Sequence, residues 1–190
     1  STDSTVEFIK IKYANSIQSG KIKLIENQHR GVSFARNCGL DLAKGELIAY
    51  LDSDNTWDED YLLIMMNSLK ENPAFKSCYS GLKIKNYETG RFEILYEETF
   101  NYNKLKEKNF IDINAFVHHR ELMKSFGGFD ESLSRLVDWD LILRYTKDND
   151  PLAIAILAVN YVLDKRLNNI TFEEGFNSNY SRLKDKIKNQ

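Results

Sequence analysis

Short apolar segments alternate with amphipathic segments along most of the chain, and this alternation predicts an α/β fold, with helices layered on a sheet. Apolar runs between turn residues predict strands at 22–26, 46–51, 75–79, 82–87, 91–96, 113–118 and 153–163. Apolar residues at helical spacing predict helices from about residue 5, at 32–42 and 58–72, before Phe126, around Trp139, and at 177–190. The turn at 88–90 predicts an antiparallel hairpin, so the sheet should be mixed. The lysine-rich stretch 103–108 is expected to be an exposed connection.

The composition fits one folded domain, because 42% of the 190 residues are hydrophobic and can form a core. The net charge is -2 and no basic stripe occurs, so a nucleic-acid partner is not expected. No apolar run reaches the roughly 18 residues of a membrane span, so no transmembrane segment is predicted. Cys38 and Cys78 lie far apart and outside any Cys/His cluster, which indicates a reduced, cytoplasmic setting without a zinc site.

The sharpest local feature is Asp52-Ser53-Asp54, which directly follows a predicted buried strand. In open α/β sheets, ligands bind at the carboxyl ends of strands. Two carboxylates one residue apart can face one hard divalent cation, which prefers oxygen ligands and leaves positions open for phosphate oxygens. The same residues also fit a helix N-cap, since Asp54, Asn55 or Asp58 can cap the helix that follows.

The aspartates belong to a longer pattern. Residues 27–37 (NQHRGVSFARN) and 51–54 (LDSD) resemble the family 2 glycosyltransferases of the GT-A fold, with Asn55 in place of that family's last aspartate. Residues 127–131 (GGFDE) resemble the family's G-G-F-D-E loop, and residues 138–141 (DWDL) resemble its later E-D-x-D-L segment. The resemblance implies a GT-A, Rossmann-like mixed β-sheet flanked by helices.

The resemblance also implies roles for four residues. Asp54 is the direct ligand of Mn or Mg, Asp52 contacts the ribose and helps to hold the metal, and Arg36 faces the nucleotide. Asp138 is the general base on the acceptor hydroxyl. A departing nucleoside diphosphate develops negative charge, which a divalent cation stabilises. Without the resemblance, Arg36 would fit an exposed helix arginine and Asp138 a first-turn helix acid.

Other candidates compete with these. The glutamate that precedes the base in the family is Val137 here, and Asp140 is a competing base, although a structural role is favoured for it. His118 and His119 point to opposite faces of a strand, so at most one reaches the site, and a surface position fits as well. Residues 166–171 resemble a late segment in which some members carry a metal-binding histidine, and no histidine is present there.

The resemblance further implies that the front of the domain is incomplete. Family members begin with a strand, and their second strand ends in D-D-G-S-T-D, of which Ser1-Thr2-Asp3 matches only the tail. We therefore expect an N-terminally truncated GT-A domain at 1–171, lacking about thirty-five residues of a strand-helix-strand unit, and a polar helical tail at 172–190. Missing strands leave a sheet edge unpaired, so an oligomer through that exposed edge is expected.

The predicted function is an inverting glycosyltransferase that moves a sugar from a nucleotide-diphosphate sugar donor to a hydroxyl of a glycan or lipid-linked acceptor. Its expected context is bacterial surface polysaccharide or glycolipid synthesis, in the cytoplasm or peripherally at the inner face of the membrane. Two alternatives stay open, because fold does not determine function. One is a noncatalytic carbohydrate or partner-binding module derived from the GT-A fold. The other is a nucleotidyltransferase of related fold, whose glycine-rich phosphate loop would lie in the missing part.

Overall fold

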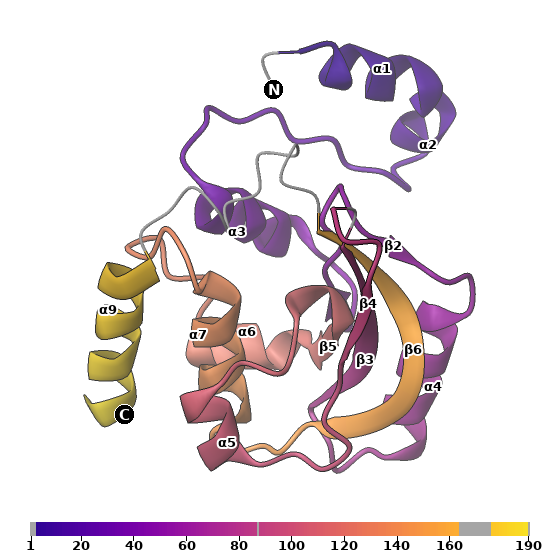
Figure 1. Cartoon of the computed structure of the whole chain (residues 1–190). Helices are drawn as coiled ribbons and strands as arrows, with labels where there is room; N and C mark the ends of the chain where they lie inside the picture. Colours follow the sequence, from indigo (N-terminus) through magenta and orange to yellow (C-terminus); the bar gives the residue numbers. More distant parts are fainter. Residues whose placement is uncertain (1–2, 87, 164–175, 190) are drawn as a thin grey trace.

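The computed structural model describes residues 3–86, 88–163 and 176–189, and within them helices cover both faces of a β-sheet (Figure 1). The strands are β1 (Leu47–Ala49), β2 (Thr56–Trp57), β3 (Ser77–Asn86), β4 (Phe92–Leu95), β5 (Phe116–His119) and β6 (Leu152–Leu163). The helices are α1 (Thr5–Lys12), α2 (Ala14–Gln18), α3 (Val32–Leu42), α4 (Tyr61–Glu71), α5 (Tyr102–Glu107), α6 (Arg120–Phe126), α7 (Val137–Thr146) and α9 (Phe176–Asn189), with a 3-10 turn η1 at Ile113–Ala115. The predicted α/β fold is confirmed.

The sheet is mixed, as the sequence predicts. Its strands lie in the order β1-β5-β3-β6-β2, and β4 pairs with β3 outside this path. Strands β3 and β6 run parallel, whereas the other pairings are antiparallel, including the predicted hairpin of β3 and β4. Within the described part of the chain, β1 pairs with β5 alone, so one edge of β1 carries no neighbouring strand.

The core has two halves, one on each face of the sheet. Neighbouring residues of a strand point to opposite faces. On β3, Cys78 packs on the side of α4 and Tyr79 on the side of α7. Strand β5 repeats the pattern, with Val117 on the α4 side and Phe116 on the α7 side. Helix α4 therefore lies on one face, and α3, α5, α6 and α7 lie on the other (Figure 1).

The helix boundaries follow local signals in the sequence. Helix α4 buries Tyr61, Met65 and Leu69, which recur every four residues on one face. It ends at Glu71, two residues before Pro73, since proline restricts the residue before it to an extended backbone. Helix α3 begins after Gly31, whose φ of 90° lies in a region that side chains with a Cβ rarely adopt.

Four predictions about the elements are wrong. Residues 22–26 form no strand, because their alternating pattern finds no neighbouring strand to pair with in the described structure. The predicted strands 75–79 and 82–87 are one strand, β3, interrupted only by a register shift around Gly81. The stretch 103–108 is not an exposed connection but largely helix α5, because Asn101 caps it and Leu105 is fully buried. The predicted strand 113–118 begins as η1 and becomes β5 only at Phe116.

Helix α9 packs against the α7 side of the core. Leu183 is buried there, and Trp139 stacks on Tyr180 with ring centroids 6.0 Å apart. The predicted boundary between 171 and 172, like the segment 166–171, lies outside the described residues, so the division into a domain and a tail stays a prediction. No helix in the described part of the chain is long and apolar enough to cross a membrane.

Candidate active site

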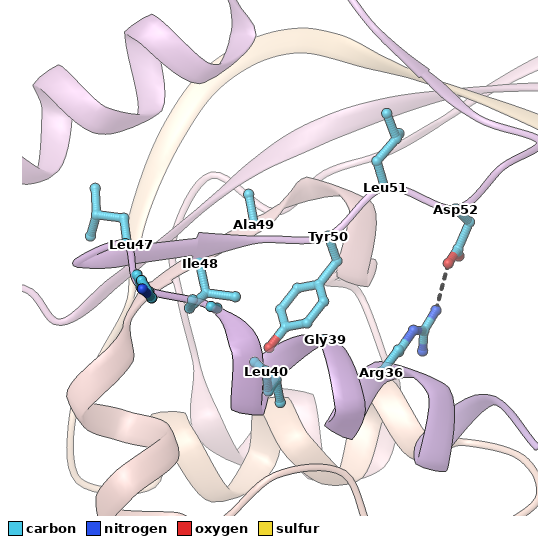
Figure 2. Close-up of a pocket in the computed structure, with 12 residues that line it drawn as sticks. Arg36, Gly39, Leu40, Leu47, Ile48, Ala49, Tyr50, Leu51 and Asp52 are labelled. Carbon is cyan, nitrogen blue, oxygen red and sulfur yellow. Dashed lines mark hydrogen bonds and ion pairs between the residues drawn. The ribbon is translucent and has the colours of Figure 1, made fainter. Parts of the chain in front are cut away.

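The loop that follows β1 carries Asp52 at the carboxyl end of the strand, where the sequence predicts it. Arg36 on α3 reaches across to this loop and donates from Nη2 to Asp52 Oδ1 at 2.7 Å (Figure 2). The guanidinium is largely buried, so this pair is shielded from solvent more than a surface ion pair. Asn55 Oδ1 accepts from the backbone N–H of Val162 at 3.3 Å, which holds the far end of the loop against β6.

Asn114, in η1, fixes the carboxylate of Asp52 from the other side. The backbone N–H of Asp52 donates to Asn114 Oδ1 at 2.6 Å, and Asn114 Nδ2 donates to Asp52 Oδ2 at 3.1 Å. The backbone oxygen of Asn114 accepts from the indole of Trp57 at 2.8 Å. Both oxygens of Asp52 are therefore engaged by protein donors, one by Arg36 and one by Asn114.

Asp112 enters the same array through Asn114. Its Oδ1 accepts from the backbone N–H and from Nδ2 of Asn114, each at 2.8 Å. Burial, together with the negative charges of Asp138 and Asp52, raises the pKa of Asp112 to about 6. Keeping the carboxylate of Asp112 ionised at the site therefore costs free energy.

Asp138 reaches the site from the first turn of α7. Leu136, at the N-cap of α7, has a φ of 61°, a left-handed backbone that costs a leucine of the order of 1–3 kcal/mol. Burial raises the pKa of Asp138, and it outweighs the opposing effect of Arg36 and of the backbone N–H groups at the helix start. The helix dipole alone therefore does not set the charge of this residue, contrary to a simple first-turn argument.

One cavity, of about 380 Å³, is lined by all four residues that the sequence singles out: Arg36, Asp52, Asp54 and Asp138. They come from α3, from the loop after β1 and from α7, so only the fold brings them together. The lining also includes Asp112 and Arg135. Four aspartates and two arginines leave this cavity with a net negative charge when all are ionised.

The metal site that the resemblance implies would rest on few protein ligands. The described residues contain no group of three His, Cys, Asp or Glu side chains that could hold an ion by themselves. Asp54 lines the cavity and has no hydrogen-bond or ion-pair partner among the described residues. One free carboxylate fits an ion such as Mg²⁺, which keeps several waters and binds mainly through substrate phosphates.

Asp140, the competing base, lies elsewhere. Its carboxylate is buried and accepts from Arg144 Nε at 3.0 Å and from Lys186 of α9. Asp140 does not line the cavity that Asp138 lines. The favoured structural role of Asp140 therefore agrees with its contacts, which tie α7 to α9.

Asn37 links two of the sequence motifs. Its side chain accepts from the backbone N–H of Phe129 at 2.8 Å and donates to the Phe129 oxygen at 3.0 Å. A Cβ on Gly128 would lie 2.4 Å from Asn37 Oδ1, so this contact needs glycine. The two motifs thus form one structural unit that supports Arg36, whose guanidinium lies 5.2 Å from the centroid of the Phe129 ring.

His118 takes neither of the positions weighed from the sequence, whereas His119 is partly exposed at the surface. His118 is fully buried in the core, where its Nε2 lies 2.9 Å from the Tyr50 hydroxyl. His119 is half-buried and lies 3.7 Å from Glu46. Neither lines the cavity of Asp138. The burial of His118 follows from its face of β5, which packs against α7.

A second cavity, of about 480 Å³, follows the unpaired edge of β1 (Figure 2). It lies between α3 and β1 and is lined by aliphatic side chains such as Leu40 and Leu47. Arg36 and Asp52 line both cavities and mark where they meet.

Asp112 and Asn114 were missed by sequence reasoning. They stand in an irregular stretch before β5, without a motif or a periodic pattern. The available signal was polar residues at the start of the predicted apolar strand 113–118, with Asp112 directly before it and Asn114 inside it, because a polar side chain at a buried position needs a partner.

Comparisons with known proteins identify a family and relatives for this chain. The model of the family described as Glycosyl transferase family 2 matches residues 1–125. The chain is 31% identical over 156 residues to the UDP-Glc:alpha-D-GlcNAc-diphosphoundecaprenol beta-1,3-glucosyltransferase WfgD of Escherichia coli, covering 81% of this chain and 58% of WfgD. It is 23% identical to the chondroitin synthase of Escherichia coli, over 77% of this chain and 21% of that protein.

Solved structures show the same fold. TarS 1-349 of S. aureus, in complex with UDP-GlcNAc, matches with a TM-score of 0.71 and 17% identity, over 96% of this chain and 52% of that one. The mixed sheet flanked by helices is therefore the GT-A fold that the sequence motifs imply. The chain spans about half to three fifths of the lengths of TarS 1-349 and WfgD.

Proposed function

This chain belongs to glycosyltransferase family 2, and from that premise we propose that its site transfers a sugar from a UDP-sugar to a hydroxyl of a lipid-linked glycan, with inversion at the anomeric carbon. The observation that carries the proposal is the convergence of Arg36, Asp52, Asp54 and Asp138 on one cavity. A cation, a paired carboxylate, a free carboxylate and a buried carboxylate on a helix start provide separate groups for the donor, a metal and the acceptor.

The donor side of the site is assigned to Arg36 and Asp52. WfgD is named for UDP-Glc, and TarS binds UDP-GlcNAc in its complex, which supports a uridine nucleotide here. Asp52 accepts hydrogen bonds from Arg36 and Asn114, and its remaining lone pairs suit a ribose hydroxyl. Arg36 offers a permanent cation near the diphosphate.

A divalent cation, Mn²⁺ or Mg²⁺, fits this site as part of the donor complex. The cavity is already net negative, so a diphosphate would be repelled without added positive charge. Asp54 would hold the ion, helped by Asp52. When bound, the ion supplies positive charge that stabilises the departing diphosphate.

Asp138 acts as the general base. Its raised pKa makes the ionised carboxylate a better proton acceptor. The carboxylate takes the proton of the acceptor hydroxyl as that oxygen bonds to the anomeric carbon. The bond from this carbon to the diphosphate oxygen breaks on the opposite side, so a single displacement inverts the configuration. Arg36 lowers the pKa of Asp138 and thereby keeps part of it ionised.

The proposed acceptor is a GlcNAc-diphospholipid, by analogy with the substrate for which WfgD is named. A lipid-linked acceptor would bring the protein to the inner face of the bacterial membrane, in surface polysaccharide or glycolipid synthesis. The unpaired edge of β1 is proposed as an interface with a second copy of the chain, since an exposed strand edge offers unpaired backbone groups.

The test measures sugar transfer from UDP-Glc to a synthetic GlcNAc-diphospholipid, with and without Mn²⁺. We expect Mn²⁺-stimulated transfer in the parent protein and its loss in Asp54→Ala, with an unchanged thermal unfolding temperature. Asp60→Ala is the matched control, because Asp60 is exposed and makes no side-chain cap bond. Binding of UDP-Glc without turnover would favour the noncatalytic module, and Mn²⁺-stimulated transfer in Asp54→Ala would remove Asp54 from the metal site.

A further inference from the structure

We propose that Asp112 binds the acceptor: its second carboxylate oxygen accepts a hydrogen bond from the hydroxyl that neighbours the one deprotonated by Asp138. The inference rests on the proposed function and adds a substrate requirement to it. The acceptor ring should present two adjacent free hydroxyls, one for each aspartate.

The orientation of Asp112 is set by Asn114. Two N–H groups of Asn114 hold Oδ1 of Asp112, each at 2.8 Å, whereas Oδ2 has no hydrogen-bond partner in the described part of the chain. Asn114 itself is buried and held by the backbone N–H of Asp52 at 2.6 Å. One carboxylate oxygen of Asp112, Oδ1, is therefore occupied by hydrogen bonds within the protein. The other, Oδ2, can accept a hydrogen bond from a ligand in the cavity that Asp112 lines.

A purely structural role would not need the charge of Asp112. Capping of η1 uses Oδ1 alone, through the backbone N–H of Asn114, and the amide oxygen of an asparagine could accept that bond equally well. The carboxylate instead carries the cost of burial beside other acids, which raises its pKa to about 6. An ionised carboxylate that costs free energy and lies beside a cavity indicates a ligand that donates hydrogen bonds to it.

The ligand is a neutral hydroxyl on the acceptor side. A diphosphate is anionic and would be repelled by this carboxylate, whereas a hydroxyl donates a charge-assisted hydrogen bond to it. Asp112 and Asp138 line the same cavity, so one acceptor ring seated there can meet both carboxylates. Neighbouring hydroxyls of one sugar ring match two neighbouring carboxylates.

The experiment combines a protein change with a substrate change. The acceptors are the GlcNAc-diphospholipid and its analogue that lacks the hydroxyl at carbon 4, the neighbour of the attacking hydroxyl at carbon 3. Asp112→Asn is the test variant: Asn114 must hold its amide oxygen, so the open position becomes an N–H donor. Asp60→Asn is the control, since Asp60 is exposed and outside the cavity.

In the parent protein, loss of the hydroxyl should raise the acceptor KM about tenfold, as expected for one hydrogen bond to a charged group. Asp112→Asn should raise KM about as much with the complete acceptor, and no further with the analogue. The KM for UDP-Glc should change less than the KM for the acceptor. Asp60→Asn should behave as the parent with both acceptors.

Two results would overturn the inference, and they are distinguishable. If the protein change and the substrate change add independently, or if Asp112→Asn leaves the acceptor KM unchanged, Asp112 does not bind that hydroxyl although the proposed function stands. If the parent protein transfers no sugar to either acceptor, the proposed function fails and this inference fails with it. A lower unfolding temperature for Asp112→Asn would also contradict the argument, which treats its charge as a burden on the fold.

Discussion

Acid should destabilise this protein through His118 on β5, the strand that pairs with β1. The imidazole is fully buried. Its Nδ1 lies 2.9 Å from the backbone oxygen of His119, which can only accept, so Nδ1 carries the proton. Nε2 then accepts from the Tyr50 hydroxyl at 2.9 Å. Protonation of His118 would place a positive charge in the core and reverse this hydrogen bond, since the Tyr50 hydroxyl would have to accept from Nε2.

The size of the effect follows from the pKa of His118, which burial lowers from 6.5 to about 4. Between these two values the unfolded chain binds a proton that the folded chain does not, so folding loses free energy as the pH falls. The full contribution is present above about pH 6.5. At 1.36 kcal/mol per unit, the loss is about 2 kcal/mol by pH 5 and about 3 kcal/mol by pH 4.

Urea unfolding at about pH 7 and about pH 5 measures this loss. His118→Gln, which cannot titrate, should lose about 2 kcal/mol less than the parent between the two pH values. His119→Gln is the matched control, because it removes the neighbouring, half-buried histidine and keeps His118. Equal pH dependence in the parent and in His118→Gln would refute the argument, since the buried imidazole would then not be the group that responds.

The other expected outcomes concern the site and the loop that supports it. Asp138→Asn should lower the transfer rate by about a hundredfold to ten-thousandfold, while UDP binding measured by calorimetry stays unchanged. If Asp140→Asn is slow and Asp138→Asn transfers at the parent rate, Asp140 is the base. Gly128→Ala should lower the free energy of unfolding by about 1–3 kcal/mol, because the new Cβ would lie 2.4 Å from a side-chain oxygen of α3. Gly39→Ala is the control and should not lower this free energy, since no atom lies within 4 Å of a Cβ at that position. Asp112→Asn should stabilise the protein by about 3 kcal/mol near pH 7, because the pKa of this carboxyl rises from 3.8 to about 6 on folding. The gain should vanish below about pH 3, where the carboxyl is protonated in both states, and an equal gain at both pH values in urea unfolding would contradict this.

The sequence alone determined the parts that depend on neighbouring residues. An apolar run that ends in Asp52 places a carboxylate just past a strand, whatever the rest of the fold does. A helix with apolar residues every four positions and a proline after it, as in α4, is equally local. For this reason the α/β class and the positions of Arg36, Asp54 and Asp138 on their elements were predictable from short windows of sequence.

The tertiary structure decided which of these residues meet, because that depends on the order of strands and on contacts between distant segments. The residues 22–26 have a strand-like pattern and no strand to pair with, so the pattern alone predicts wrongly. Asp112 and Asn114 joined the site only because β5 lies next to β1, which brings Asn114 against Asp52 across 62 positions of sequence. A buried polar side chain must find its partner wherever the fold supplies one, and no local pattern records that partner.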